Sequence, residues 1–405
     1  MKLYFDDAEF DQQLQRTFAK AVCRMCDVGE VFAVAHRVES GNLDSWHDAW
    51  AAAGESNRQL AEKSAGAKAN RDAGDAFLRA SECYRSAYFF CRRAPQGAQL
   101  LEAFRASRAL FRRAIPYLPV DVDTVEIPYE DTAIPGYVVW GAGDRSGPTV
   151  LLPAGYDSPV EESYSLGALE GALRGMNVVM FGGPGQGEML YESKIPFRHD
   201  FEAVIGPVID FVDRHDGLAS DRIALIGRSF AGYLAPRAAA TERRIGVLAA
   251  DPAQTDMFAT VQAQLPAAWL KMVEADDPSF NDAFWKANPG VDKEEFWMSR
   301  FRAHGLEAPL DYIDEMKKWV VDVEAIACPT YVSYGEGDYA QATAADFYKR
   351  LKVPKHFEMF KDADGSGGHC EGMGQSRYYA GVFGFIENRL QHEQPWNGEV
   401  TGGQA

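Results

Sequence analysis

The sequence predicts an α/β protein in which helices cover a mostly parallel β-sheet. An all-helical domain is expected before this sheet and a helical insertion within it. Three observations predict this architecture. The first part of the chain has helical spacing of apolar residues without strand-like alternation. The rest alternates short apolar runs with helical segments. One connection between two of these runs is far too long for a single helix.

Residues 1–118 are predicted to form the all-helical domain. Apolar residues recur there at helical spacing, as in Phe77, Ala80, Tyr84, Ala87, Tyr88 and Cys91. Near Pro116 and Pro119 the pattern changes to β-rich runs. We therefore place the boundary to a second domain, residues 119–395, at this point.

Short apolar runs in the second domain are the predicted strands, and helical patterns lie between most of them. The runs are Val122–Tyr129, Ile134–Trp140, Thr149–Leu152, Asn177–Phe181, Arg222–Ile226, Ile245–Ala249, Pro329–Tyr334 and Lys355–Phe360. Strands that alternate with helices form parallel sheets with both faces covered. The first two runs are joined by a turn, and we expect them to be an antiparallel edge of the sheet.

The long connection spans roughly 75 residues, from Ala250 to Cys328, whereas connections in compact domains are usually short. It is too aromatic for disorder, with Trp269, Phe284, Trp297 and Trp319 among its residues. We predict that residues 253–325 form a helical lid over the strand ends. The alternative is an additional packing layer that does not contact substrate.

Charge and composition limit the partners. The net charge of −18 disfavours nucleic acid and anionic membranes. No apolar stretch approaches the roughly 18 residues of a membrane span, and the acidic start is unlike a signal peptide, so a cytoplasmic location is expected. The six cysteines are too sparse for a disulfide framework.

A sharp turn between a strand and a helix is the strongest chemical signal. The run ending at Ile226 is followed by Gly227-Arg228-Ser229-Phe230-Ala231-Gly232 and then by a helix-like segment. Such a turn needs small residues because its backbone is strained and closely packed, and it exposes the serine hydroxyl beside a helix N-terminus. The pattern is G-x-S-x-G with alanine at the last position. We predict that Ser229 is a nucleophile.

Two further groups complete a nucleophile–base–acid arrangement. His369 lies in a glycine-rich loop after the last predicted strand, and the chain order of nucleophile, acid and histidine agrees with a known hydrolytic triad. The acid should follow the penultimate strand, where Asp338 is our choice and Glu336 the alternative. No metal or cofactor is expected.

Backbone amides are expected to stabilise the oxyanion of such a reaction. One should belong to Phe230, directly after the nucleophile, and the other to Tyr156 in the loop after the strand Thr149–Leu152. Gly155 would let this loop approach the substrate.

Other residues are candidates for lining the site. Asp157 follows Tyr156 in the loop, and the glycine-rich turn 182–188 lacks the lysine of a phosphate loop and is expected to line the pocket. Arg228 and Asp251 are weaker candidates, for which a structural ion pair is the alternative.

These motifs together resemble a known family. The matching stretches are Gly155-Tyr156-Asp157-Ser158 with Glu161-Glu162, Pro184-Gly185-Gln186-Gly187-Glu188, Gly227-Arg228-Ser229, Gly335-Glu336-Gly337-Asp338 and Gly368-His369. They resemble the α/β-hydrolases with an N-terminal helical domain, which include 2,6-dihydroxypseudooxynicotine hydrolase and the fungal heptaketide-shortening hydrolase. The resemblance covers nearly the whole chain and implies the α/β-hydrolase fold.

The resemblance also implies an activity. It implies cleavage of a carbon–carbon bond beside a ketone by Ser229, Asp338 and His369, without a cofactor and often by a homodimer. The same triad would serve an esterase, lactonase or acyltransferase, because only the leaving group changes. A hydrolase-like protein that binds a small metabolite without catalysis is a remote alternative.

Overall fold

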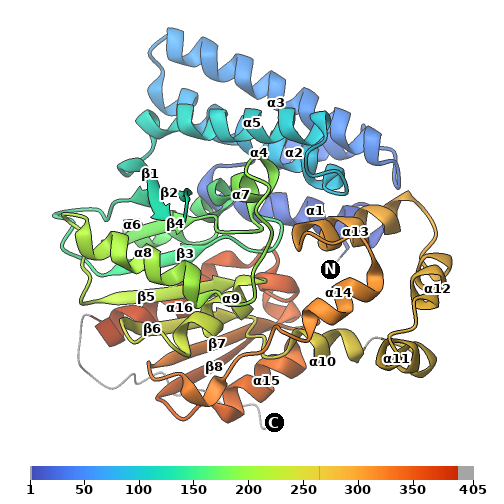
Figure 1. Cartoon of the computed structure of the whole chain (residues 1–405). Coiled ribbons are helices and arrows are strands. Elements are labelled where there is room, and N and C mark those ends of the chain that lie inside the picture. The colour runs from blue at the N-terminus through green and yellow to red at the C-terminus, as the bar shows by residue number, and fades with distance from the viewer. Residues whose placement is uncertain (1, 264, 391–405) are drawn as a thin grey trace.

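The structure is a computed structural model that describes residues 2–263 and 265–390. Its centre is an eight-stranded sheet with the order β1-β2-β4-β3-β5-β6-β7-β8 (Figure 1). The strands are β1 Val122–Tyr129, β2 Thr132–Val139, β3 Thr149–Pro153, β4 Asn177–Phe181, β5 Ile223–Arg228, β6 Ile245–Asp251, β7 Thr330–Gly335 and β8 Lys355–Phe360. Strands β1 and β2 form the antiparallel edge, and the strands from β4 to β8 pair in parallel. The predicted fold class is therefore confirmed.

Both faces of the sheet are covered, which explains why its strands are nearly continuous apolar runs. Alternate residues of the fully buried β3 belong to two different cores. Leu151 packs in the core that contains α8 (Glu202–Arg214) and α9 (Ala231–Ala239). Val150 and Leu152 belong to the opposite core, with Phe383 of α16 (Gln375–Leu390). The remaining helices around the sheet are α6 (Ala168–Leu173), α7 (Gly187–Tyr191) and α15 (Gln341–Arg350).

Strands β5 and β6 each extend two residues beyond the predicted apolar runs. The added residues include Arg228 and Asp251, which face each other in the parallel register and form a buried ion pair. A charged residue usually marks the end of an apolar run, but here each charge is neutralised by the neighbouring strand. The strands can therefore continue to the edge of the sheet where the serine turn begins.

The first part of the chain is helical, as predicted. Its helices are α1 (Ala8–Phe18), α2 (Val28–Ala35), α3 (Leu43–Gly66), α4 (Asn70–Tyr88) and α5 (Ala98–Ala114). They lie together on one side of the sheet, at the top of Figure 1. The ring of Phe111 in α5 packs edge-on against Tyr137 of β2 and Tyr164, so α5 rests directly on the sheet domain.

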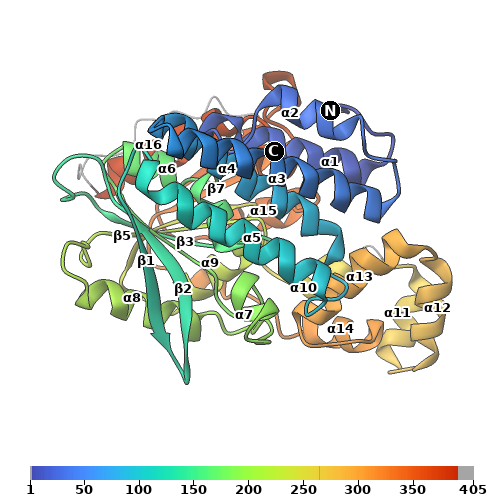
Figure 2. The ribbon, with the colours of Figure 1, turned by 90° about the horizontal axis from the view of Figure 1, so that it is seen from above.

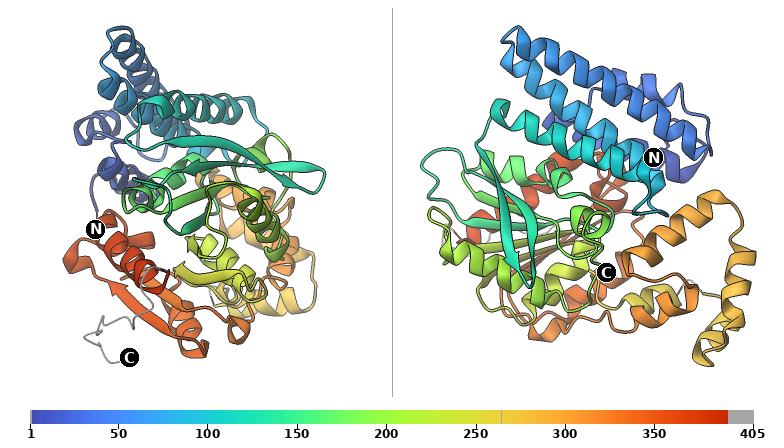
Figure 3. Two further views of the ribbon diagram at one scale, coloured as in Figure 1. Left: turned by 90° about the vertical axis from the view of Figure 1, so that its left-hand side faces the viewer. Right: turned by 45° about the horizontal axis from the view of Figure 1, so that its top comes forward.

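Among the described residues, five α-helices are inserted between β6 and β7. They are α10 (Met257–Gln262), α11 (Ala267–Glu274), α12 (Ser279–Ala287), α13 (Val291–Ala303) and α14 (Pro309–Met316). Figure 2 shows that α11 and α12 lie farthest from the sheet, whereas α13 and α14 lie closer to it. In the right-hand view of Figure 3 the N-terminal helices lie above the sheet domain and the inserted helices lie to its right.

The predicted domain end at residue 395 lies outside the described residues. No helix within residues 2–263 and 265–390 combines the length and the apolar composition that a membrane span requires.

A buried group of charges joins the N-terminal helices to the sheet domain. Lys20 Nζ lies 2.6 Å from carboxylate oxygens of both Glu82 and Glu162. Arg16 Nε donates a 2.7 Å hydrogen bond to Glu162, whose side chain is fully buried. Burial would raise the pKa of Glu162, but Arg16, Lys20 and Arg85 hold it well below its usual range. Glu162 belongs to the sheet domain, whereas Arg16, Lys20 and Arg85 belong to the helical domain. The negative charge of Glu162 is therefore balanced only when the two parts are docked.

We expect Glu162→Gln to destabilise the protein by about 3–5 kcal/mol, because it leaves buried cations without a counter-charge. Urea unfolding followed by circular dichroism measures this change. Glu55→Gln is the matched control, since Glu55 pairs with Arg58 on the exposed face of α3 and should contribute at most about 1 kcal/mol. Equal losses for both variants would contradict the structural role of the buried group.

Candidate active site

The backbone of Ser229 has a left-handed conformation, with φ of 58°. Its amide donates a 2.7 Å hydrogen bond to the Asp251 carbonyl at the end of β6. The turn is packed so closely that a Cβ atom on Gly227 would lie 2.0 Å from the Ala231 carbonyl oxygen, and one on Gly232 would lie 2.0 Å from that of Pro252. Only glycine fits at these two positions. The second close approach falls on Gly232, so alanine is accommodated at position 231.

Ser229, His369 and Asp338 form one chain of hydrogen bonds at the carboxyl edge of the sheet. His369 Nε2 lies 2.9 Å from Ser229 Oγ, and His369 Nδ1 lies 2.8 Å from Asp338 Oδ2. The other carboxylate oxygen of Asp338 accepts a 2.9 Å bond from the Ala340 amide, and the side chain is fully buried. Glu336, the alternative acid, instead accepts a bond from the Asp362 amide. The geometry therefore favours Asp338 over Glu336.

Arg228, the residue before Ser229, links the serine turn to the histidine loop. Its guanidinium pairs with Asp251 at 3.1 Å and with Glu371 at 2.8 Å. It also donates hydrogen bonds to the Cys370 carbonyl and the Gln375 amide oxygen. Arg228 and Asp251 thus form the structural ion pair that was predicted from the sequence as the alternative to lining the site. Because Cys370 follows the histidine directly, this contact sets the position of the His369 backbone.

The loop after β3 passes close to Ser229. A Cβ atom on Gly155 would lie 3.4 Å from Ser229 Cβ, so the backbone of this loop comes near the serine. Within residues 2–263 and 265–390, the amides of Tyr156 and Phe230 donate no hydrogen bond. Backbone donors are usually paired, so two unpaired amides beside a nucleophile are available to an oxyanion.

Gln186 of the glycine-rich turn holds this loop in place. Its side-chain amide donates hydrogen bonds to the carbonyls of Ala154 and Gly155, the latter at 3.1 Å, and its oxygen accepts a 2.7 Å bond from Gly183. The side chain is almost fully buried. The turn was expected to line the pocket, but the Gln186 side chain contacts the loop backbone instead.

Asp157 anchors the outer end of the loop to the helical domain. Its carboxylate lies 2.9 Å from Arg16 and 3.4 Å from Arg92. Burial would raise the pKa of Asp157, but Arg16 and Arg92 lower it to about 2. Asp157 therefore stays ionised and ties the loop of Tyr156 to the N-terminal helices.

Comparison with known proteins assigns the chain to a family. The sequence pattern of the alpha/beta hydrolase family matches residues 149–373, more than half of the chain and the whole stretch from β3 to the histidine loop. The chain belongs to the α/β-hydrolase family. The match includes Ser229, Asp338 and His369.

Alignments with similar proteins cover most of this hydrolase. The alpha/beta hydrolase gkaG of Penicillium citrinum is 32% identical over 375 residues, with 85% of each chain covered. The 20-hydroxy-prefusarin hydrolase FUS2 of Gibberella moniliformis is 30% identical, covering 80% of this chain and 81% of its own. The crystal structure of 2,6-dihydroxy-pseudo-oxynicotine hydrolase aligns with a TM-score of 0.68 over 93% of this chain and 97% of its own, at 19% identity, and thus shares the fold. The predicted resemblance is confirmed.

The imidazole of the α/β-hydrolase is surrounded by groups that favour its protonated form. Burial alone would lower the pKa of His369, but the Cys370 thiol, the Tyr339 hydroxyl and the Asp338 carboxylate raise it well above its ordinary value. A base with a raised pKa is neutral, and able to accept a proton, only at higher pH.

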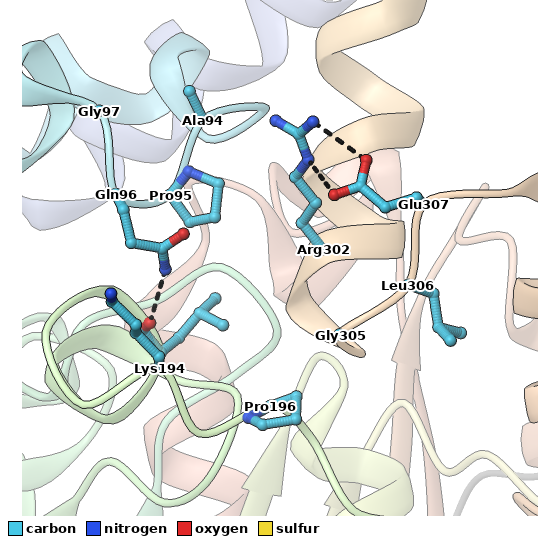
Figure 4. Close-up of a pocket in the computed structure, with 11 residues that line it drawn as sticks. Ala94, Pro95, Gln96, Gly97, Lys194, Pro196, Arg302, Gly305, Leu306 and Glu307 are labelled. Carbon is cyan, nitrogen blue, oxygen red and sulfur yellow. Dashed lines mark hydrogen bonds and ion pairs between the residues drawn. The ribbon is translucent and has the colours of Figure 1, made fainter.

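A surface pocket of about 400 Å³ lies apart from the triad (Figure 4). It is lined by residues from three segments. They are Ala94–Gly97 before α5, then Leu190, Lys194 and Pro196 at the end of α7 and after it, and Arg302, Gly305, Leu306 and Glu307 at the end of α13 and after it. Arg302 and Glu307 form an ion pair at its rim. The pocket opens where the helical domain, the sheet domain and the insertion meet.

Several residues that shape the site were not predicted as functional. Gln186 was visible within a quoted motif, but its role depends on a contact with a loop 31 residues away. Glu371 lies only two residues from His369, and an acidic residue so close to the predicted base in a glycine-rich loop was the available sequence signal. The structure shows that its carboxylate is buried. Arg16 and His304 carry no local sequence signal, because their neighbours in space are distant in the chain.

We expect kcat/KM of the hydrolase to rise with pH, with a midpoint above the ordinary histidine pKa of about 6.5, because only neutral His369 can accept the serine proton. Asp338→Asn should lower that midpoint and reduce kcat by a factor on the order of 10⁴, as loss of the orienting acid does in a serine protease. Rates of ester hydrolysis across pH measure both effects. Glu336→Gln is the control and should leave the pH midpoint and kcat almost unchanged. A larger loss of kcat for Glu336→Gln than for Asp338→Asn would make Glu336 the orienting acid.

We expect Gln186→Met to lower kcat by about 10- to 100-fold, somewhat less than the 10²–10³ lost with an oxyanion donor itself. The substitution removes the hydrogen bonds that orient the loop carrying the Tyr156 amide, while the triad stays intact. Steady-state kinetics should show the fall in kcat with an unchanged pH midpoint. Gln59→Met on the exposed face of α3 is the control. An unchanged kcat for the Gln186 variant would refute the positioning role.

Proposed function

We propose that this hydrolase cleaves a carbon–carbon bond adjacent to a ketone, in a 1,3-diketone or a polyketide or aryl ketone, through an acyl-enzyme on Ser229. The observation that carries the proposal is the hydrogen-bonded chain from Ser229 through His369 to Asp338, next to two unpaired amides. A nucleophile, a base, an orienting acid and oxyanion donors are the groups that acyl transfer requires.

The first half of the reaction forms the acyl-enzyme. His369 Nε2 accepts the proton of Ser229 as the serine oxygen adds to the substrate carbonyl, and Asp338 stabilises the resulting imidazolium. The amides of Phe230 and Tyr156 bind the tetrahedral oxyanion. Collapse breaks the bond between the carbonyl carbon and the adjacent carbon. The electron pair leaves as an enolate, which is protonated by the His369 imidazolium.

The second half releases the acid. Water loses a proton to His369 and adds to the acyl-enzyme carbonyl, forming a second oxyanion on the same amides. Collapse now expels Ser229, which regains its proton from His369. The net reaction converts one diketone and one water into a ketone and a carboxylic acid.

The ketone substrate is supported by the resemblance described above and by the aromatic surroundings of the site. The rings of Tyr156 and Phe230 lie 4.7 Å apart and adjoin Phe197 and Trp319. Aromatic rings suit a planar, conjugated substrate. An esterase, lactonase or acyltransferase would use the same triad, so the leaving group remains the question for experiment. A protein that binds a metabolite without catalysis is the remote alternative.

We further propose that residues 253–325 act as a lid on the domain of residues 119–395. The Tyr156 hydroxyl donates a 3.0 Å hydrogen bond to the Arg300 carbonyl, and the Phe197 amide bonds to the Ala303 carbonyl at 2.9 Å. Glu295 of α13 also accepts hydrogen bonds from amides of residues 92 and 93. These contacts support a cover over the oxyanion loop that excludes water from it. The homodimer implied by the resemblance stays a prediction.

Activity on an aryl 1,3-diketone compared with a p-nitrophenyl ester tests the proposed reaction. We expect kcat/KM to be higher for the diketone, and Ser229→Ala to reduce kcat for both by a factor on the order of 10⁶, as in a serine protease. A fluorophosphonate probe should label the wild type and not the variant. Preference for the ester would favour the esterase alternative, and an active Ser229→Ala variant would remove Ser229 from the mechanism.

A further inference from the structure

Six rings form a seam between the inserted helices and the sheet domain. We define this aromatic seam by Tyr156, Phe197 and Phe230 on the sheet side and by His304, Tyr312 and Trp319 on the side of the insertion. The imidazole of His304 lies at its centre, with ring centroids 4.8 Å from Trp319 and 5.3 Å from Phe197.

His304 has no polar partner in this seam. Neither ring nitrogen makes a hydrogen bond among the described residues, although the residue is only 7% exposed. Burial lowers the pKa of His304 to about 3, so the ring is neutral at ordinary pH and offers one N–H donor and one acceptor nitrogen. Leaving a buried polar group unpaired costs about 1–3 kcal/mol. A purely apolar seam would be filled better by phenylalanine.

The unpaired imidazole lies beside the side chains of the two residues whose amides are the proposed oxyanion donors. Its ring centroid is 5.7 Å from the ring of Tyr156 and 6.3 Å from the ring of Phe230. The seam is therefore built in part from the two residues that carry the proposed oxyanion donors.

The surface pocket of Figure 4 is lined by chain neighbours of two seam residues. Pro196 and Gly305 line the pocket and are the immediate neighbours of Phe197 and His304 in the chain. A Cβ atom on Gly305 would lie 3.3 Å from the Pro196 ring, so these two residues meet between the pocket and the seam. The pocket borders both sides of the seam, and a movement of the insertion that separated the two sides would extend it inward.

We propose that the aromatic seam is a binding site for the planar ketone part of the substrate and that His304 hydrogen-bonds its oxygen. The inference rests on the proposed function and adds to it the residue that recognises the leaving group. When the carbon–carbon bond breaks, the electron pair delocalises onto the oxygen of the leaving ketone. An N–H donor beside that oxygen stabilises the enolate, while the rings stack on the conjugated part. An ester such as p-nitrophenyl acetate has no ketone oxygen at this position, because its leaving oxygen is bonded directly to the carbonyl carbon, and it would not use His304.

The test compares His304→Phe with His304→Gln and with Tyr164→Phe. The Tyr164 hydroxyl is another buried group without a partner among the described residues, but it packs against α5 in the other core. It is therefore a matched control for removing an unpaired polar atom. Each variant is examined by thermal unfolding, by kinetics with 1-phenylbutane-1,3-dione and p-nitrophenyl acetate, and by calorimetric titration of the diketone into the same variant carrying Ser229→Ala.

We expect His304→Phe to keep or raise the melting temperature while lowering diketone affinity and kcat/KM by about 5- to 150-fold, the equivalent of losing one buried hydrogen bond. Turnover of p-nitrophenyl acetate should change less than about threefold, within the scatter of a packing change. His304→Gln should recover part of the diketone binding, because its amide retains a donor. Tyr164→Phe should change neither the binding of the diketone nor the turnover of either substrate.

Two outcomes would overturn the inference. One is diketone binding and turnover in His304→Phe equal to wild type. The other is an equal loss for both substrates together with a lower melting temperature in both His304 variants, which would make the histidine structural. Failure of the proposed function differs from both. In that case wild type would not turn over the diketone, and the titration in the Ser229→Ala background would still report whether His304 contributes to ketone binding.

Discussion

The contact between the serine turn and the end of β6 is the constraint on which the rest of the site depends. The Ser229 amide binds the Asp251 carbonyl at 2.7 Å, and this bond helps to hold a left-handed residue in place. The Asp251 side chain pairs with Arg228, and Arg228 in turn binds the backbone of the histidine loop. Ser229 and His369 are thus positioned by one continuous network of buried contacts.

The oxyanion loop depends on contacts with all parts of the molecule. Gln186 holds its start, Arg16 and Arg92 of the helical domain hold Asp157, and the Arg300 carbonyl of the insertion accepts a bond from the Tyr156 hydroxyl. A short loop after a strand has little structure of its own. The helical domain is therefore more than an addition to the sheet, because its cations hold the loop that carries the Tyr156 amide, one of the proposed oxyanion donors.

Buried polar groups in this hydrolase are of two kinds. The charges around Arg228 and around Glu162 are neutralised by opposite charges in buried ion-pair networks, as the free-energy cost of burial requires. Among the described residues, neither ring nitrogen of His304 has a hydrogen-bond partner, although the residue is buried. The first kind holds the fold and the triad together. The second is the arrangement expected of a group that meets its partner only when a ligand is present.

The sequence by itself determined the fold class, the strand positions and the residues of the proposed triad. It could do so because apolar periodicity and the small residues of the Ser229 turn are local properties of the chain. Only the tertiary structure gives a reason to favour Asp338 over Glu336, since two carboxylates two residues apart differ in direction rather than in sequence pattern. It also revealed the roles of Gln186 and Arg16, whose partners lie 31 and 146 residues away. Such contacts depend on how helices and loops pack, which no local spacing encodes.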